Sequence, residues 1–272
     1  MTAPTEPGLY AGVPEDVYHR DRSSLSSSGA RRLLELAPAE WLYELEHPEV
    51  REPTPEMEKG TATHTLVLGV GPRIVEVKAP DWKKPANQKL RREIRARGEV
   101  PLLSHEIDLV ETMAEAVLTH DEAGPLFDVG TPEVSAYGRD PLTRVMMRAR
   151  TDWLHRRRGV DLKTCESSAP DDFEDEVRRF GYHVQQWWYE ATFAAAERPL
   201  DDFVFVAVAK RPPHLVAVHR LKRRVVDLGG DIARRALTKY AACRESGAWP
   251  DHGPGPHEID LPNWEFKKEY SR

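Results

Sequence analysis

Residues 148–164 read RARTDWLHRRRGVDLKT, and this stretch decides the fold that we expect. Apolar and β-branched residues recur on both sides of a short basic run, from Val145 to Leu154 and from Val160 to Thr164. Short runs of this kind, separated by a few turn-compatible residues, are typical of paired strands. We therefore expect two strands joined by a hairpin connection at residues 155–159.

The hairpin brings three ionisable side chains toward one place. Side chains alternate between the faces of a strand, so Asp161 and Lys163 should share a face, and the pairing should put Asp152 beside Asp161. Two carboxylates offer the hard oxygen ligands that Mg²⁺ and Mn²⁺ prefer, and a bound ion of this kind activates water against a phosphodiester. A lysine two residues from a ligand can orient that water or stabilise the developing negative charge. An alternative stays open, in which both aspartates only form surface salt bridges with Lys163, Arg148 and Arg150.

The context of Asp161 and Lys163 separates them from chance matches. An acidic residue, any residue and a lysine occur in this order four times in the chain. Only the pair at 161 and 163 follows an aspartate-bearing strand and precedes a helix that carries Gln185 and Tyr189. These two side chains are four residues apart and share a helix face, where they can hydrogen-bond a phosphate, a base edge or a metal ligand. We expect the two tryptophans between them in the core.

The rest of the sequence predicts helices around a mixed sheet. In the first part we expect an irregular arm at 1–22, a helix opened by the serines of 24–28, and a helix from about Pro55 to Leu68 that carries His64. A strand at 73–78, a basic loop with a short helix at 80–100 and a helix at 105–120 should follow. Around the hairpin and after it we expect a strand at 133–137, helices at about 170–180 and 182–197, strands at 203–209 and 215–221, a helix at 225–246 and an irregular cap at 247–272. This order predicts a single α/β (α+β) domain with a helical part at about 23–120 and a catalytic core at about 130–246.

Composition limits the function classes. The chain of 272 residues has 40% hydrophobic and 31% charged residues, which is a globular composition. No apolar run approaches the roughly 20 residues of a membrane helix, and the first residues lack the pattern of a signal peptide, so we expect a cytoplasmic protein without a membrane partner. Two cysteines cannot supply a four-thiolate cluster. No glycine-rich phosphate loop is present, which argues against a nucleotide-driven motor or a dehydrogenase.

Net charge is −6, which counts against a nucleic-acid partner. Basic residues nevertheless gather in clusters, and local clusters can bind phosphates despite a negative total. The candidate DNA-binding residues are Arg148, Arg150, Arg156, Arg157, Lys83 and Lys84. Each cluster could equally be a solvated face.

Taken together, these residues resemble a known family. The ordered set is Gly60-x-x-x-His64, Glu133-x-Ser135, Arg150-x-Asp152, Asp161-Leu-Lys163-Thr164 and Gln185-x-x-x-Tyr189, with Ser24-Leu-Ser26-x-Ser28 before it and Trp249-Pro250 and Leu261-Pro262-x-Trp264 after it. It resembles the nuclease domain of RecE, or exonuclease VIII, over roughly residues 10 to 265. That family is a branch of the PD-(D/E)XK superfamily, with relatives in lambda exonuclease and the RecB nuclease domain.

The resemblance implies a restriction-endonuclease-like core, a central mixed sheet flanked by helices, and a role for each residue. His64, Asp152 and Asp161 would bind Mg²⁺ or Mn²⁺, with the Leu162 carbonyl as a further ligand. Lys163 would act on the attacking water, and Gln185 and Tyr189 would form the accessory catalytic motif. Glu133 carries over only as an accessory residue, because its strand could serve the site or the sheet.

The resemblance also implies what the enzyme acts on and assembles with. It implies digestion of linear double-stranded DNA from its ends, 5′ to 3′, which leaves 3′ single-stranded overhangs for phage-type recombination. A ring-like homo-oligomer and a single-strand annealing partner of the RecT type are implied too, in the host cytoplasm if a phage encodes the chain. Two alternatives remain open: an endonuclease of the same fold, and a non-catalytic DNA-binding or assembly module.

Overall fold

A mixed β-sheet forms the centre of the molecule in the computed structural model, which describes residues 2–48 and 52–269. Within those residues its seven strands run in the order β1-β5-β6-β7-β8-β9, and β2 pairs with β6. The strands are β1 Gly8–Tyr10, β2 Leu25–Ser26, β5 Thr131–Arg139, β6 Met146–His155, β7 Arg158–Cys165, β8 Asp202–Ala209 and β9 Val216–His219. Pairing is antiparallel except between β7 and β8 and between β2 and β6. The mixed sheet confirms the predicted fold class.

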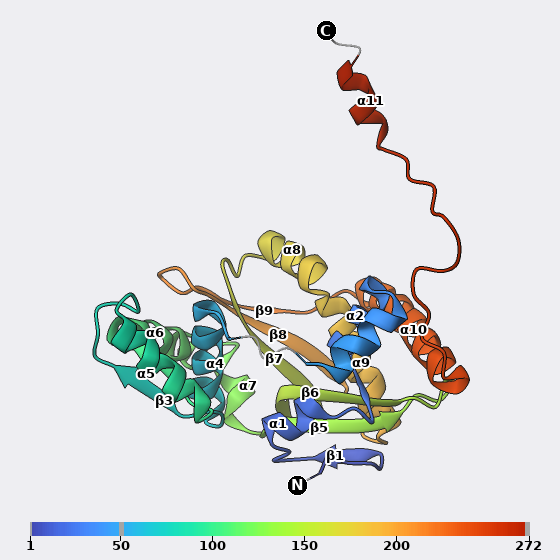
Figure 1. The fold of residues 1–272 in the computed structure, drawn as a ribbon. Coiled ribbons are helices and arrows are strands. Elements are labelled where there is room, and N and C mark those ends of the chain that lie inside the picture. The colour runs from blue at the N-terminus through green and yellow to red at the C-terminus, as the bar shows by residue number, and fades with distance from the viewer. Residues whose placement is uncertain (1, 49–51, 270–272) are drawn as a thin grey trace.

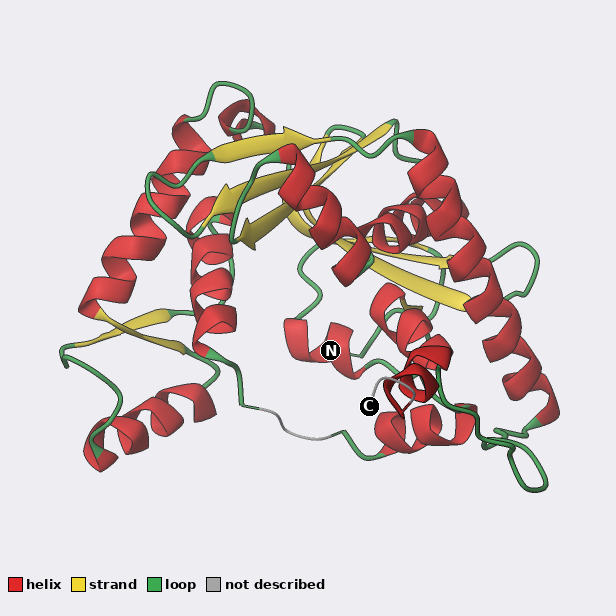
Figure 2. Cartoon of the chain, turned by 90° about the horizontal axis from the view of Figure 1, so that it is seen from above, coloured by secondary structure: helices red, strands yellow, loops and turns green. Residues whose placement is uncertain are grey.

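Helices cover both faces of this sheet (Figures 1 and 2). They are α1 Glu15–Arg20, α2 Ser27–Glu35, α3 Pro38–Glu46, α4 Pro55–Leu68, α5 Pro85–Ala96, α6 Ser104–Thr119, α7 Gly124–Asp128, α8 Pro170–Phe180, α9 Tyr182–Ala195, α10 Arg223–Ser246 and α11 Asn263–Glu269. Among the described residues, no helix combines the length and the apolar character that a bilayer crossing requires.

Alternation along β7 and β8 builds two separate cores. Val160 and Leu162 pack with alternate valines of β8 against α4 and α6. The opposite positions of β8, Phe203 and Phe205, pack with Phe173 of α8. Asp161 and Lys163 therefore lie on the α8 and α9 side of the sheet, because successive side chains of a strand point to opposite faces.

The β6–β7 hairpin is tighter than the sequence predicted. Its strands meet at the pair His155–Arg158, so two residues form the connection instead of five. The first of them, Arg156, has a φ of 59°, in the left-handed region that tight hairpin turns use. Other boundaries agree with the prediction more closely: α4 begins at Pro55 and ends at Leu68, where Gly69 follows with a φ of 70°.

Two sequence expectations differ in part from the structure: the loop with a short helix at 80–100, and the single helix after the serine run. Residues 80–100 contain the twelve-residue helix α5, and Val100 begins β4 (Val100–Leu103), which pairs in parallel with β3 (Ile74–Val77). The segment is mostly polar, and Ile94, which is 1% exposed, anchors the helix on this small sheet. The single helix predicted after the serine run is two helices, α2 and α3, because Pro38 starts a new first turn.

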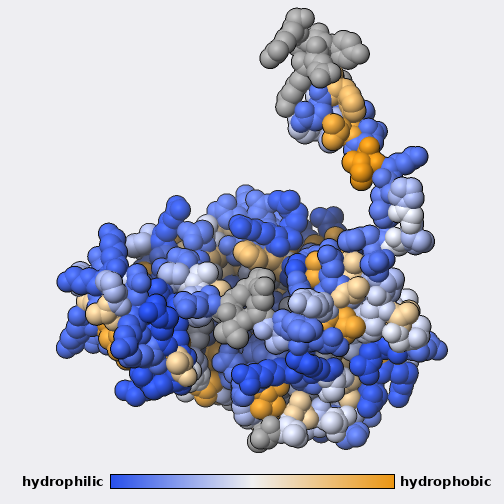
Figure 3. Space-filling view, viewed as in Figure 1, coloured by the Kyte–Doolittle hydropathy of each residue, from blue (hydrophilic) through white to orange (hydrophobic). Residues whose placement is uncertain are grey.

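The N-terminal and C-terminal segments also differ from the prediction. Residues 1–22 were expected to be irregular, but β1 pairs with β5 and α1 follows it. The expected cap over residues 247–272 holds only at its start, where Trp249 stacks on Trp41 with ring centroids 5.4 Å apart. Beyond it, the chain extends away from the body and carries α11 (Figure 1). Figure 3 shows apolar residues along this projecting segment, where Ile259 is 85% exposed.

Candidate active site

Three acidic residues lie in one row across neighbouring strands. The pairs Trp153–Val160 and Leu154–Gly159 set the register of β6 and β7, which places Asp152 opposite Asp161. On the other side of β6, Glu133 falls between the pairs Pro132–Trp153 and Val134–Thr151 and so faces Asp152. Glu133 has a φ of 48°, and a non-glycine residue in this region is rare and often belongs to a functional site.

Asp152 is held by the neighbouring strand. Its Oδ2 accepts a hydrogen bond from the backbone N–H of Leu162 at 2.7 Å. The same oxygen lies 3.6 Å from Nδ1 of His64. Burial, and then the charge of Asp161, raise the pKa of Asp152 well above its usual range. The carboxylates of Asp152 and Asp161 face each other across neighbouring strands and repel each other, so a cation between them would lower the free energy of the site.

Asp161 is the most enclosed of the three, with 2% of the residue exposed. Its Oδ1 accepts a hydrogen bond from Nε2 of Gln185 at 2.6 Å. Its Oδ2 lies 2.5 Å from Nζ of Lys163, yet the angles are poor and this buried oxygen has no well-formed hydrogen bond in the described structure. We take the short contact as an ion pair. The oxygen is left with lone pairs for another cation.

Lys163 is fixed from three sides. Besides Asp161, its Nζ donates to Oε1 of Gln185 at 3.3 Å and lies 4.6 Å from the centre of the Tyr182 ring. Gln185 thus bridges the carboxylate and the ammonium group. The predicted convergence of an aspartate and a lysine is present, and the glutamine orients both of them.

His64 reaches the row from α4, which crosses β7. Gly60, one turn earlier, allows this approach, since a Cβ there would lie 3.3 Å from Oγ1 of Thr164. Burial, and then the charge of Lys163, lower the pKa of His64 to about 4. The imidazole is therefore neutral near pH 7, which is the form that binds metal ions.

The helix α9 supplies the predicted accessory pair. Gly181 separates it from α8 with a φ of 67° and turns its first residues toward β7. Tyr189 packs edge-on against Phe203 at 5.8 Å, and burial raises its pKa well above 10. Of the two tryptophans between the pair, Trp188 is fully buried as expected, while Trp187 is half-buried against the core.

These side chains suit a hard divalent cation. Asp152 and Asp161 supply carboxylate oxygens, one of them without a hydrogen bond, and His64 supplies a neutral ring nitrogen. Within residues 2–48 and 52–269, no three His, Cys, Asp or Glu side chains are already gathered closely enough to enclose an ion. Binding would thus require the carboxylates to turn from their present partners, Lys163 and the Leu162 backbone.

The predicted DNA-binding residues lie in different surroundings. Arg148 is buried and donates to both the backbone and the hydroxyl of Ser24. Arg150 donates to Ser135 and to the carbonyl of Val13, so both arginines face inward and hold the N-terminal segment. The other four are exposed: Arg156 and Arg157 at the tip of the β6–β7 hairpin, and Lys83 and Lys84 at the start of α5.

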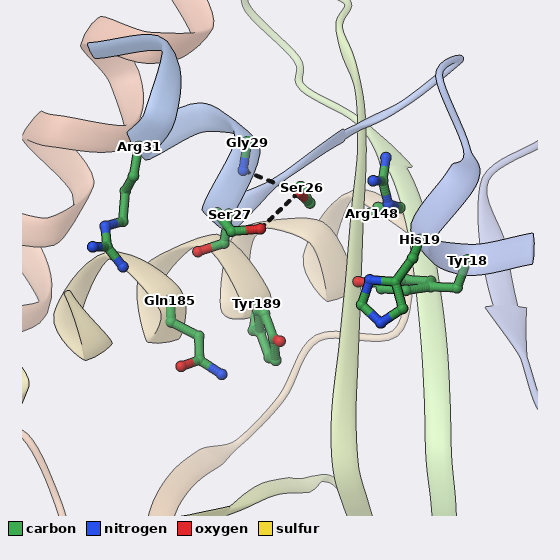
Figure 4. A pocket seen from close by; sticks show the side chains of 10 residues that line it. Tyr18, His19, Ser26, Ser27, Gly29, Arg31, Arg148, Gln185 and Tyr189 are labelled. Atoms are coloured by element: carbon green, nitrogen blue, oxygen red, sulfur yellow. Dashed lines mark hydrogen bonds between the residues drawn. The ribbon is translucent and has the colours of Figure 1, made fainter. Parts of the chain in front are cut away.

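A cavity of about 420 Å³ adjoins the row, and we name it the serine pocket. It is lined by Tyr18, His19, Ser26, Ser27, Ser28, Gly29, Arg31, Arg148, Gln185 and Tyr189. Figure 4 shows Gln185 and Tyr189 side by side on one helix, with Arg31 above them and His19 at the other end. Ser26 caps α2 by accepting from the N–H of Gly29 at 3.1 Å.

Sequence reasoning missed two contributions to this region. His19 and Arg31 line the serine pocket, and Glu15 lines a smaller cavity of about 210 Å³ together with His64 and Glu133. Each comes from the first 31 residues, far from the motif in sequence. The serine run, interpreted as a helix cap, was the one visible signal.

Comparisons with known proteins agree with the fold. A family model described as a PDDEXK-like domain of unknown function (DUF3799) matches residues 26–257. A solved structure of a candidate exonuclease from Eubacterium rectale is similar, with a TM-score of 0.64 and 12% identity over 92% of this chain and 97% of that one. A phage-related exonuclease from Haemophilus somnus 129PT matches at 10% identity over 83% and 96%, but its TM-score of 0.32 supports no argument. A comparison with curated proteins gave no match.

Proposed function

This chain belongs to the PDDEXK-like domain family, and from that premise we propose that it is a nuclease that hydrolyses phosphodiester bonds of DNA with a divalent cation. One observation carries the proposal: Asp152, Asp161, Lys163 and His64 come together beside Gln185 from four different elements. A salt-bridge ladder on the surface would not explain an aspartate that is 2% exposed or an imidazole kept neutral by burial.

The residues divide the work of hydrolysis among them. Asp152, Asp161, His64 and the Leu162 carbonyl would hold Mg²⁺ or Mn²⁺, which when bound polarises the phosphate and acidifies a water molecule. Lys163, already directed by Gln185, orients that water and offsets the negative charge that grows on the phosphate oxygens. Water gives up one proton as it adds to phosphorus, the bond from phosphorus to the leaving oxygen breaks, and the leaving oxygen takes up one proton from solvent.

We propose further that the enzyme degrades linear duplex DNA from its ends. Support comes from the resemblance to RecE-type nucleases and from the serine pocket, which Gln185 and the first residues of α2 line together. The pocket offers the guanidinium group of Arg31 and the N-terminus of a nine-residue helix, which together favour a phosphate. Lys83, Lys84, Arg156 and Arg157 would contact the duplex farther out.

The remaining parts of the proposal rest on the resemblance alone. They are 5′ to 3′ polarity, a ring-like homo-oligomer, a RecT-type annealing partner and action in the cytoplasm. Light scattering of the purified protein tests the oligomer, since a monomer of 30.9 kDa would exclude a ring. Co-purification with the annealing partner tests the association.

End-labelled DNA tests the activity. Linear duplex labelled at the 5′ or the 3′ end, and closed circular DNA, are incubated with Mg²⁺ or with EDTA, and Asp161→Ala is the control. We expect Mg²⁺-dependent release from 5′ ends, intact circles and no release by the variant. Cleavage of circles would favour the endonuclease. Binding without cleavage in either Mg²⁺ or Mn²⁺ would favour the non-catalytic module.

A further inference from the structure

A second cavity, of about 520 Å³, lies at the far end of the β5–β6 hairpin. We name it the arginine pocket, because Arg139, Arg144 and Arg244 line it. All three are exposed, and within the described part of the chain none of them has an acidic partner within ion-pair distance. Glu245 is the one acidic side chain in the lining, so the pocket has an excess of two positive charges.

A buried carboxylate holds the wall of this pocket in place. Asp140 is fully buried, forms an ion pair with Arg234, and accepts two bonds of 2.8 Å from the N–H and the hydroxyl of Thr143. The N–H of Arg144 closes the turn onto the Asp140 carbonyl at 2.9 Å. This turn holds Arg144 at a φ of 61°, a conformation that costs energy for a non-glycine residue. The arginine is therefore presented from a rigid base.

The donors that remain in the pocket are guanidinium groups. The hydroxyl of Ser23 donates to Asp21 at 2.6 Å, and that of Thr143 is used by Asp140, so neither is left to donate to a ligand. Arg244 lies 5.9 Å from the ring of Tyr240, which forms the inner wall. Several forked cationic donors without acidic partners match the oxygens of phosphate groups.

The arginine pocket is aligned with the proposed active site along one strand. Met146 lines it, Arg148 lines the serine pocket, and Asp152 belongs to the acidic row. All three are even-numbered positions of β6. Because the N-terminal segment covers Arg148 and Arg150 between them, β6 sets the distance between the two sites and DNA would pass outside that segment. Six residues at about 3.3 Å each separate the ends by roughly 20 Å, which corresponds to about six base-pair rises along the axis of a DNA duplex.

From this spacing and from the arginines left unpaired within the described residues, we propose that the arginine pocket binds backbone phosphates of DNA about six base pairs along the duplex axis from the cleaved bond. The inference rests on the proposed nuclease function and adds a remote binding site to it. The pocket would bind DNA of any sequence, because contacts to phosphates fix the position of the protein on DNA but do not distinguish the bases. It would lengthen the stretch of DNA that the enzyme holds.

Salt-dependent DNA binding tests this proposal. Hairpin DNAs with stems of about 5 and about 16 base pairs are titrated in EDTA at several KCl concentrations, with fluorescence polarisation as the readout. The variant combines Arg139→Ala, Arg144→Asn and Arg244→Ala, with asparagine at 144 because it tolerates positive φ. Arg235→Ala is the matched control, an exposed arginine of α10 outside the pocket. Thermal unfolding of each variant confirms the fold.

We expect the triple variant to bind the long stem at least about tenfold more weakly, with the slope of log K against log [KCl] reduced by roughly 2 to 3. The short stem and Arg235→Ala should behave like the wild type. An unchanged slope on the long stem, or an equal loss on both stems, would overturn the proposal. Binding of inorganic phosphate in calorimetry by the wild type alone, with unchanged DNA affinity, would mean that the pocket takes free phosphate instead.

This design separates the remote site from catalysis. DNA binding in EDTA can be measured whether or not the protein cuts DNA, and the nuclease activity is tested independently with Asp161→Ala. If the wild type binds neither stem, the arginine pocket proposal fails even where Mg²⁺-dependent cleavage is found. If binding behaves as expected but no metal supports cleavage, the pocket stands and the nuclease proposal fails.

Discussion

Replacing Gln185 by leucine should remove the bridge between Asp161 and Lys163 while filling nearly the same volume. The bond from Gln185 to Asp161 is 2.6 Å long and ends on a carboxylate that is 2% exposed. A hydrogen bond to a charged group contributes about 1.5–3 kcal/mol. The second bond, 3.3 Å to Lys163, is longer and adds less. We therefore expect a loss of about 2 kcal/mol in the arrangement of the site.

This loss of free energy should lower the rate at which the enzyme hydrolyses DNA. Each 1.36 kcal/mol changes a rate about tenfold, so kcat/KM of Gln185→Leu on linear duplex DNA should fall roughly 30-fold. Gln186→Leu is the matched control, because Gln186 makes a 2.8 Å bond to a different carboxylate, that of Glu190. Initial rates of nucleotide release in Mg²⁺ measure both. Equal losses in the two variants, or wild-type kcat/KM in Gln185→Leu, would refute the bridging role.

Three further outcomes follow from the same structure. Mg²⁺ or Mn²⁺ should raise the thermal unfolding midpoint above its value in EDTA, and this shift should vanish in Asp161→Ala if that carboxylate is a ligand. Gly229→Ala should destabilise the protein by about 1–3 kcal/mol in denaturant unfolding, since its Cβ would lie 2.2 Å from the carbonyl of His183. Gly8→Ala should cost less, because its Cβ would make only ordinary contacts of 3.4 Å with the Tyr10 ring. Burial raises the pKa of Asp140, but bonds from Thr143 and the Arg234 ion pair outweigh it and lower the pKa below 3.8. The stability that Asp140 contributes is then complete above about pH 4 and lost as pH falls further, so the deficit of Asp140→Asn should shrink in acid unfolding curves.

The active-site row could be predicted because its causes are local. The alternation of β7 puts Asp161 and Lys163 on one face, and a short hairpin puts Asp152 opposite them, so neighbouring residues alone bring these three together. Glu133 joins the row through the pairing of β5 with β6. The helix boundaries at Pro55 and Gly69 were readable for the same reason, since capping depends on a few adjacent residues.

Features that depend on distant contacts could not be predicted. Arg148 and Arg150 belong to a basic cluster in the sequence, but α1 and the serine segment cover their face of β6 and turn them into internal donors. A short helix was expected within residues 80–100, but the contact of Ile94 with Val77 of β3 and Leu103 of β4 joins segments that the sequence does not link. The serine and arginine pockets each combine segments more than 100 residues apart.

The acidic row also limits where residues can be inserted into the chain or deleted from it. Because Glu133, Asp152 and Asp161 match across three strands, inserting one codon within β7 before Asp161 would reverse the faces of every later residue in the strand. Asp161 and Lys163 would then point toward α4, and the apolar Leu162 would take their place. An insertion of two residues would restore the faces, but it would move Asp161 and Lys163 two positions along the strand, out of line with Asp152 and Glu133. Length variation among homologous genes should therefore gather in segments such as residues 247–262, outside these three strands.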